Sequence, residues 1–269
     1  MMQSATAGTA TGGWDCHVHV FEPGAIALPG HYTPAPAALA DVEELAAAHG
    51  IEHLVLVQPS VYGTDNSVME RALRSAGNRH RGVAVVAADV DDATLDRLHE
   101  AGVRGVRFNL VSPVGNDAAD LPRLAPRLRE RGWHVQWYAG RSHLQSIADL
   151  QARTRLTFVL DHLAGLRVDE ADSAASRIAL RQLAAAGCWV KLSGWYRLGA
   201  AEPYRSIVPA IRQVAELFGE RMVWGSDWPH TALAPSAQSR FASLLQPVRE
   251  ALGASEFERC LQGGRLYGA

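Results

Sequence analysis

The stretch Leu54-Val55-Leu56-Val57 contains only large aliphatic side chains, so both faces of this segment are apolar. A second run, Val83-Ala84-Val85-Val86-Ala87, has the same character. Strands that are apolar on both faces are typical of a parallel sheet covered by helices, whereas a half-exposed strand alternates apolar and polar residues. These two runs therefore predict a buried parallel β-sheet.

Similar apolar runs recur at intervals of roughly 20 to 35 residues, which is the period of a repeated strand–helix unit. The sequence predicts eight strands: Trp14–Val20, Ile51–Gln58, Gly82–Ala87, Val103–Asn109, Trp133–Tyr138, Leu156–Asp161, Cys188–Leu192 and Met222–Ser226. Segments with apolar residues at helical spacing lie between them, among them Asp41–His49, Ser67–Ala76, Leu121–Arg131, Ser173–Ala186 and Tyr204–Phe218. A glycine such as Gly50 or Gly187 precedes most strands and is suited to the left-handed residue that ends a helix.

An open, doubly wound sheet would show the same alternation of strands and helices. However, no glycine-rich phosphate-binding turn follows the first strand, and eight strands are a number that closes a barrel. A length of 269 residues suits one such domain. We therefore predict a single-domain (β/α)₈ TIM barrel over residues 14–269, preceded by a small, polar and flexible leader, residues 1–13.

The composition excludes several classes of function. The net charge is −2, from 26 Lys and Arg against 28 Asp and Glu, and no basic run suggests nucleic acid as a partner. No apolar stretch reaches the ~18 to 20 residues that cross a bilayer, and the leader lacks the charged and apolar regions of a signal peptide. Three scattered cysteines do not form a disulfide framework or a Cys-type zinc site. We expect a cytoplasmic protein whose oligomeric state the sequence does not indicate.

The first strand ends in a pair of histidines, His17 and His19. Alternate residues of a strand share a face, so we expect these two side chains to project together while Cys16 and Val18 point into the helix layer. Either histidine alone could be a satisfied core residue. Two imidazoles this close together favour a site that binds one metal ion or polarises one carbonyl group.

Two further polar residues follow apolar strands, at points where the strand-to-helix loops of a barrel form its active site. His162 follows the sixth strand and Asp227 follows the eighth, just before Trp228-Pro229. A carboxylate at the end of a buried strand is costly to leave unpaired. Asp227 could cap a helix or pair with an arginine, but three histidines at other strand ends favour a role as general base or ligand.

These motifs resemble the amidohydrolase superfamily over nearly the whole chain, from Trp14 to Tyr267. Gly225-Ser226-Asp227-Trp228-Pro229-His230, with Arg265-Leu266-Tyr267, is similar to its amidohydrolase-related (amidohydrolase 2) branch. Within that branch, several segments resemble the lactonases, the 2-pyrone-4,6-dicarboxylate lactonases above all. These segments are Gln58-Pro59-Ser60, Gly63-Thr64-Asp65-Asn66, Gly105-Val106-Arg107-Phe108-Asn109 and Lys191-Leu192-Ser193-Gly194 with Arg197.

The resemblance also bears on metal binding. Metal-dependent members of the superfamily usually have a histidine at the end of the fifth strand, where this chain has Tyr138, and binuclear members have a bridging ligand on the fourth strand, where this chain has Arg107 and Asn109. We therefore exclude a binuclear site. A mononuclear Zn²⁺ site could still use His17, His19, His162 and Asp227. Because the pyrone dicarboxylate lactonases also lack the strand-5 histidine, the likeness favours hydrolysis without a metal cofactor.

The resulting hypothesis is a hydrolase that opens a lactone of a carboxylated or sugar-acid small molecule. Asp227 would act as general base on water, and His17, His19 and His162, with one or more of them protonated, would polarise the carbonyl group. Arg107 and Arg197 are candidates for binding a substrate carboxylate. The alternatives are a salt bridge inside the barrel for Arg107 and a solvated loop charge for Arg197. Tyr32, Ser60 and Tyr138 could add neutral hydrogen-bond donors.

One departure and two alternatives qualify this hypothesis. The resemblance implies a second arginine after the fourth strand, but Leu110-Val111-Ser112-Pro113 contains no basic residue. A lactone with one carboxylate, or a sugar-acid lactone recognised through its hydroxyl groups, therefore fits at least as well as a dicarboxylate. The first alternative is a zinc-dependent decarboxylase of the same superfamily. The second is a catalytically silent relative that binds a carboxylate.

Overall fold

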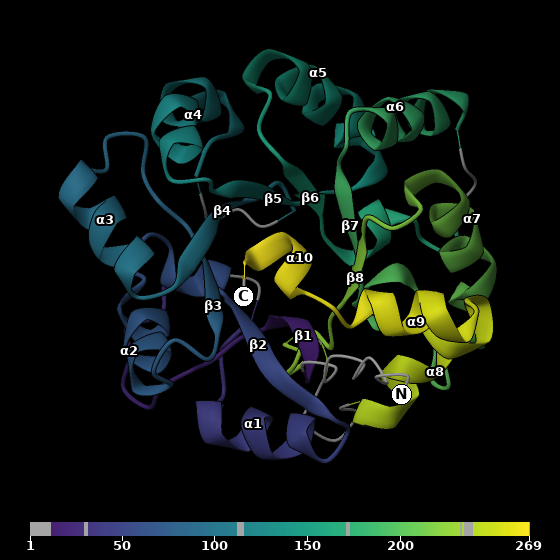
Figure 1. The fold of residues 1–269 in the computed structure, drawn as a ribbon, viewed down its shortest axis with the longest axis horizontal. Coiled ribbons are helices and arrows are strands. Elements are labelled where there is room, and N and C mark those ends of the chain that lie inside the picture. Colours follow the sequence, from purple (N-terminus) through teal and green to yellow (C-terminus); the bar gives the residue numbers. More distant parts are fainter. Residues whose placement is uncertain are drawn as a thin grey trace, which may run out of the picture.

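The barrel closes in the order that the sequence predicts. The computed structural model describes residues 12–29, 32–111, 116–170, 173–231, 233 and 239–268. Eight parallel strands pair in chain order around the ring in Figure 1. They are β1 (Gly13–Val18), β2 (Ile51–Val57), β3 (Arg81–Ala84), β4 (Val103–Asn109), β5 (His134–Tyr138), β6 (Phe158–Leu160), β7 (Trp189–Leu192) and β8 (Met222–Trp224).

Two backbone hydrogen bonds join the first strand to the segment that follows the last. The N–H of Asp227 donates to the carbonyl of His17 at 2.8 Å, and the N–H of His19 donates to the carbonyl of Trp228 at 2.8 Å. The same bonds bring two of the predicted site segments side by side. The single-domain (β/α)₈ barrel is therefore confirmed.

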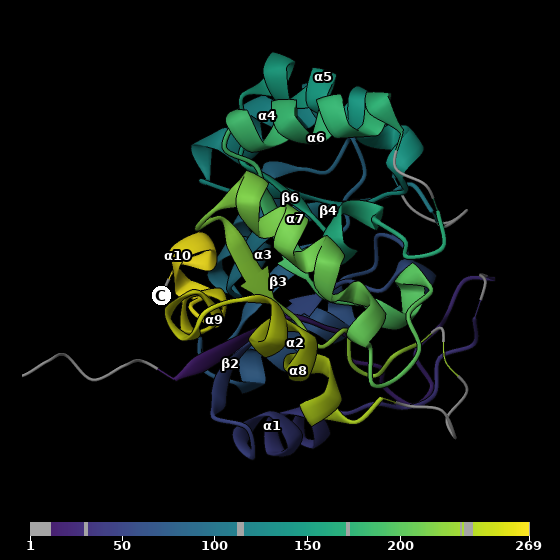
Figure 2. The same cartoon turned by 90° about the vertical axis from the view of Figure 1, so that its right-hand side faces the viewer.

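Helices surround the strands on the outside of the ring (Figure 1). They are α1 (Leu39–Ala47), α2 (Ser67–Ser75), α3 (Asp92–Glu100), α4 (Leu121–Glu130), α5 (Leu144–Thr154), α6 (Ala174–Ala185), α7 (Val208–Phe218), α8 (Phe241–Ala251) and α9 (Ala254–Cys260), whereas α10 (Gly264–Tyr267) does not belong to this outer layer. The short α10 lies over the centre of the ring at the end where the C-terminus emerges, as Figures 1 and 2 show together. Tyr267 of α10 stacks on Trp14 near the start of β1, whereas His17 and His19 lie at and beyond its other end.

Several strands are shorter than predicted: β1, β2, β3, β6 and β8 stop early at the end that leads into the site, and β5, β6 and β7 begin late at the other end. The predicted strand Gly82–Ala87 ends at Ala84, and His19, Asp161 and Ser226 lie just beyond their strands. Beyond these strand ends the chain continues into loops. His19, Asp161 and Ser226 therefore lie on loop segments that the strands hold in place. Of the predicted leader, residues 1–11 lie outside the described part of the chain.

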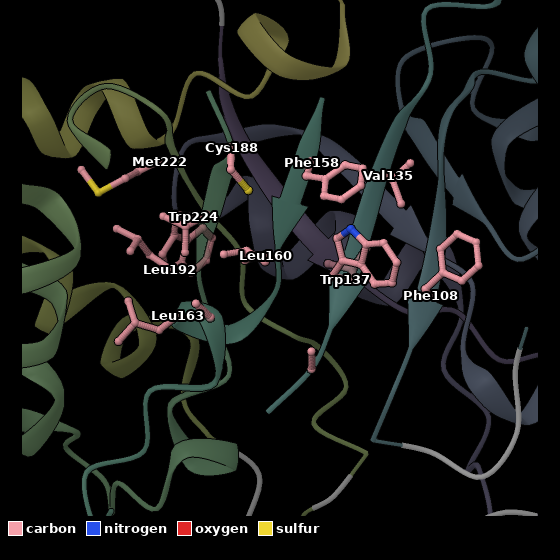
Figure 3. Close-up of a cluster of buried hydrophobic side chains, with 14 of the residues drawn as sticks. Phe108, Val135, Trp137, Phe158, Leu160, Leu163, Cys188, Leu192, Met222 and Trp224 are labelled. Atoms are coloured by element: carbon pink, nitrogen blue, oxygen red, sulfur yellow. The ribbon is translucent and has the colours of Figure 1, made fainter. Parts of the chain in front are cut away.

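Apolar side chains form one layer outside the barrel wall and a smaller cluster inside it. Figure 3 shows part of the outer layer, where Trp137, Leu160 and Trp224 from three strands pack under the helices. The inner cluster comprises Trp14, Cys16, Val55, Val57, Val83, Val223 and Tyr267. Tyr267 comes from α10, so this cluster fills the end of the barrel opposite the site.

The expectation that Cys16 faces the helix layer was wrong. Asp15 pairs with Leu54 and Val18 with Leu56, so three residue steps on β1 match two on β2. Such a shift inserts one extra residue, as a β-bulge does. Cys16 consequently packs in the inner cluster. His17 also faces the barrel interior, where its Nδ1 lies 3.3 Å from Oδ1 of Asp161. The prediction assumed that side chains alternate between the two faces along the whole of β1. That assumption holds only where the pairing of β1 with β2 is uninterrupted.

Within the described ranges, no helix is both long enough and apolar enough to pass through a membrane.

Candidate active site

The structure brings the four predicted catalytic residues together. Nε2 of His19 lies 3.4 Å from Oδ1 of Asp227, and Nε2 of His17 lies 3.7 Å from the same oxygen. The ring centroids of His17 and His162 are 4.8 Å apart. All four residues are buried, with His19 the most accessible at 4 %. Residues from β1, β6 and β8 thus meet around one point at the carboxyl ends of the strands.

Two of these residues have unusual backbone conformations. His162 has a φ of 48° and Asp227 a φ of 62°, both in the left-handed region that non-glycine residues rarely adopt. Leu163 and Ala164 continue the same conformation after His162. Strained residues of this kind persist only where the surrounding structure holds them, and they cluster at functional sites.

The two oxygens of Asp227 have different surroundings. Oδ2 accepts hydrogen bonds from the hydroxyl of Tyr196 and from Nε of Arg197, both at 2.5 Å. Oδ1 makes no hydrogen bond to any described residue and faces the histidines. Burial alone would raise the pKa of Asp227, but the charge of Arg197, the largest opposing cause, outweighs it and holds that pKa well below its usual value. Asp227 is therefore an anion whose Oδ2 is held by two hydrogen bonds and whose Oδ1 is available to accept another.

Burial also keeps the three histidines neutral. Desolvation lowers the pKa of His162 to about 4, that of His19 below its usual value, and that of His17 well below it. The expectation that one of them carries a proton therefore receives no support from these shifts. Neutral imidazoles have one N–H and one lone pair, so the partners of each ring decide what it can do.

The partners of the Nδ1 atoms differ. Nδ1 of His19 lies 2.7 Å from the carbonyl oxygen of Val57, which can only accept, so His19 has its proton on Nδ1 and a lone pair on Nε2. Nδ1 of His162 lies 3.0 Å from Oγ of Ser193, which can donate or accept. Nδ1 of His17 lies 3.3 Å from Oδ1 of Asp161 and 3.5 Å from Nζ of Lys191.

A buried polar group behind His17 was not assigned from the sequence. It consists of Asp161, Gln136 and Lys191, all of which have 1 % exposure or less. Lys191 donates to Oε1 of Gln136 at 2.6 Å, and Gln136 donates to Oδ2 of Asp161 at 3.0 Å. A signal was present, because Lys191 is the only lysine in a chain with 26 Lys and Arg, and it occurs in an apolar strand.

The predicted substrate-binding residues line one cleft above the histidines. The cleft is lined by His19, Tyr32, Pro59, Ser60, Arg107, Asn109, Tyr138, Arg197 and Thr231. The guanidinium carbons of Arg107 and Arg197 lie 5.4 Å and 5.7 Å from the ring centroid of Tyr138. Both arginines therefore contribute positive charge to the same small space.

Each arginine also has a carboxylate partner within the protein. Nε of Arg107 lies 3.3 Å from Oδ2 of Asp161, and Nε of Arg197 contacts Asp227. Arg197 also donates to the hydroxyl of Thr231 at 3.0 Å. Both arginines are thus paired within the protein, as the alternative for Arg107 has it, and binding of a substrate carboxylate stays a prediction for both. The predicted departure after β4 falls partly on residues 112–115, outside the described residues.

The ligand-type side chains fit one metal ion better than two. His17, His19 and Asp227 form one group whose potential ligand atoms lie within 4.8 Å of one another, and His17, Asp161 and His162 form another. Nε2 of His17, Nε2 of His162 and Oδ1 of Asp227 have no hydrogen-bond partner among the described residues. However, Lys191 and Arg107 both contact Asp161, and these cations oppose a second metal ion there. The arrangement fits at most a mononuclear site.

Comparisons with known proteins agree with this geometry. The chain is 36 % identical over 238 residues to a 2-pyrone-4,6-dicarboxylate hydrolase of Comamonas testosteroni, covering 82 % of this chain and 78 % of that protein. It is 33 % identical over 228 residues to a 4-sulfomuconolactone hydrolase of Rhizobium radiobacter, covering 82 % and 76 %.

A solved structure is also similar throughout. A probable 2-pyrone-4,6-dicarboxylic acid hydrolase from Acinetobacter baumannii, with citric acid bound, superposes with a TM-score of 0.84 at 26 % identity, over 96 % of this chain and 99 % of that one. The family model described as Amidohydrolase matches residues 14–268. The chain therefore belongs to this amidohydrolase family.

Proposed function

We propose that this protein hydrolyses the ester bond of a lactone that carries a carboxylate. The observation that carries the proposal is the pairing of a free carboxylate oxygen, Oδ1 of Asp227, with three neutral imidazoles beneath a cationic cleft. Two relatives with more than 30 % identity are named as hydrolases of acidic lactones, which supports the same reaction class.

Asp227 and His19 are suited to hold the attacking water. Oδ1 of Asp227 and Nε2 of His19 are both acceptors and lie 3.4 Å apart. One water molecule can donate a hydrogen to each, which leaves its oxygen lone pairs directed away from the protein. Asp227 then takes the proton as the carbon–oxygen bond forms. A general base in this role typically raises the reaction rate about 10²- to 10⁴-fold.

His17 and His162 are suited to stabilise the oxyanion. Their Nε2 atoms have no hydrogen-bond partner among the described residues, and their rings lie 4.8 Å apart. When the proton of each ring is on Nε2, both donate to the oxygen of the tetrahedral intermediate, and donors fixed in a buried site lower its energy most effectively.

Arg107, Tyr32 and Ser60 are proposed to bind the substrate carboxylate at the other side of the cleft. Arg107 is 4 % exposed and lies beside Tyr138, so a carboxylate that reaches it leaves most of its hydration shell and needs a charge-assisted partner. Arg197 is engaged by Asp227 and Thr231, so we assign it to orienting the base. With Arg197 assigned to the base, Arg107 is the single arginine proposed to bind a substrate carboxylate, which favours a lactone with one carboxylate over a dicarboxylate.

The proposed reaction does not require a metal cofactor. If a zinc ion binds, His17, His19 and Asp227 with His162 would hold it, and it would polarise the water or the carbonyl group. The charges of Arg107, Arg197 and Lys191 around these residues supply positive potential without an ion. This is what favours the metal-independent form over a zinc-dependent decarboxylase.

The test is a panel of lactones followed by proton release in weakly buffered solution. The panel contains pyrone, muconolactone-type and sugar-acid lactones, each as the free acid and as the methyl ester. We expect turnover of at least one free acid and much slower turnover of its ester. Release of carbon dioxide would instead support the decarboxylase. Tight binding of the acids without turnover would support the silent relative.

A further inference from the structure

Lys191 lies in a compact triangle with His17 and Asp161. Its Nζ is 3.5 Å from Nδ1 of His17 and 3.6 Å from Oδ1 of Asp161, and these two atoms are 3.3 Å from each other. Lys191 has no exposed surface, and its ammonium lies 5.8 Å from the ring centroid of Tyr267. It touches neither the cleft nor the space where the substrate is proposed to bind.

The identity of the residue at this position is informative. The chain uses arginine at every other Lys or Arg position, so the single lysine stands where a compact ammonium fits among three acceptors. Burial lowers the pKa of Lys191, and the charge of Asp161 acts in the opposite direction. Gln136 anchors the group by accepting from Lys191 at 2.6 Å. These contacts satisfy a charge that would otherwise be too costly to bury.

The proton on His17 can be on either nitrogen, and the triangle determines which. If Nδ1 carries it, Nδ1 donates to Asp161 and Nε2 presents a lone pair; carboxylate–histidine–metal sites are built in this way. If Lys191 donates to Nδ1, the proton is on Nε2, which then points toward Asp227 and the reacting carbonyl as a donor.

We propose that Lys191 is a positioning residue that holds His17 in the form with its proton on Nε2, so that His17 donates to the oxyanion and does not bind a metal ion. This inference deepens the proposed function and rests on it for the role of His17 in the reaction. Without Lys191, Asp161 would draw the proton to Nδ1. His17, His19 and Asp227 would then present two lone pairs and a carboxylate oxygen, which is a complete three-residue site for a divalent ion.

The experiment compares Lys191→Met with the parent by titration with Co²⁺, followed by its visible absorption. We expect Lys191→Met to bind Co²⁺ about 10- to 100-fold more tightly than the parent, the range over which groups that hydrogen-bond metal ligands change affinity. The gain should disappear in Lys191→Met/Asp161→Asn. Arg181→Met, which removes an exposed charge on α6, controls for net charge. Equal Co²⁺ affinity in Lys191→Met and the parent overturns the proposal.

A second measurement uses the parent alone, in case Lys191→Met does not fold. Because the chain has one lysine, ¹⁵N-lysine labelling gives a single side-chain resonance. We expect this resonance to shift in His17→Asn and to stay unchanged in Arg181→Met; a signal indifferent to His17 contradicts the proposal. The lactone panel tests the proposed function separately, since neither the cobalt titration nor the resonance depends on turnover.

Discussion

Oδ1 of Asp227 lies 3.4 Å from Nε2 of His19, although both atoms are hydrogen-bond acceptors. Two acceptors this close repel each other unless a group with hydrogens or positive charge lies against both. The remaining contacts of the two residues fix this arrangement, since Arg197 and Tyr196 hold the far side of Asp227 and Val57 holds the far side of His19. The pair is thus arranged before any substrate arrives.

Replacing Asp227 by asparagine tests this pair. The amide oxygen is expected to remain on Arg197, so the amide N–H₂ group faces His19 and no base is left. We expect kcat for the lactone to fall about 10²- to 10⁴-fold, as for the loss of a general base. Asp169→Asn is the matched control, because Asp169 is an exposed carboxylate that also pairs with an arginine, Arg167. Steady-state rates close to those of the parent in Asp227→Asn would remove Asp227 from the mechanism.

Arg107→Met tests recognition of the substrate carboxylate. Hydrogen bonds to charged groups contribute about 1.5–3 kcal/mol, so kcat/KM for a carboxylated lactone should fall roughly 10- to 100-fold. The methyl ester of the same lactone should lose much less, because it offers no charge to the guanidinium. Arg104→Met, which removes another arginine from β4, serves as control. Equal losses for acid and ester would show that Arg107 acts through its salt bridge with Asp161 alone.

Removal of metal ions tests the metal-independent form of the proposal. Protein dialysed against a strong chelator should keep its lactone-hydrolysing rate, and elemental analysis should find far less than one zinc ion per chain. Loss of activity on chelation that zinc restores would instead assign His17, His19 and Asp227 as ligands.

The sequence predicted the barrel because its signal is repeated. Eight apolar runs, Leu54–Val57 among them, each predict a buried strand. An error at one strand end therefore does not change the predicted fold. It also predicted the meeting of His17, His19, His162 and Asp227, because parallel strands bring their carboxyl ends to one end of a barrel.

The group behind His17 was harder to predict. The role of Lys191 depends on distances to Asp161 and Gln136 across the barrel, and no local pattern encodes such distances. Cys16 was misplaced because one residue inserted in β1 shifts the faces of its neighbours. The contact between Arg197 and Asp227 was not predicted either, because it depends on the loop after β8, where Asp227 has a φ of 62°.

Stability should depend on pH through His80, far from the site. Nδ1 of this buried ring accepts from the N–H of Leu54 at 3.2 Å, and Nε2 contacts Glu43 at 2.8 Å, so the neutral ring fits both partners. Desolvation lowers the pKa of His80, opposed by Glu43. The unfolded chain therefore binds a proton more readily, and this residue's contribution falls as the pH drops below the usual histidine value.

The measurement is urea unfolding of the parent and of His80→Gln between neutral and mildly acidic pH. The difference in unfolding free energy should shrink as the pH falls, since glutamine does not titrate. His53→Gln is the control, because His53 makes one similar contact, to the carbonyl of Arg79, but is less buried. A difference that grows on acidification would mean that Glu43 dominates and that folded His80 is charged.

Two substitutions at Tyr267 separate packing from hydrogen bonding at the closed end of the barrel. The ring is 1 % exposed and stacks with Trp14 at a centroid distance of 6.3 Å, so Tyr267→Ala should cost about 3–5 kcal/mol of unfolding free energy. The hydroxyl is buried and has no hydrogen-bond partner among the described residues. Tyr267→Phe should therefore leave stability unchanged or raise it by up to about 1 kcal/mol, because it removes a polar group that was desolvated without a partner. Urea unfolding of both variants at neutral pH decides the matter. A loss in Tyr267→Phe comparable to that in Tyr267→Ala would mean that the hydroxyl is hydrogen-bonded in solution and that α10 is held by more than its apolar contacts.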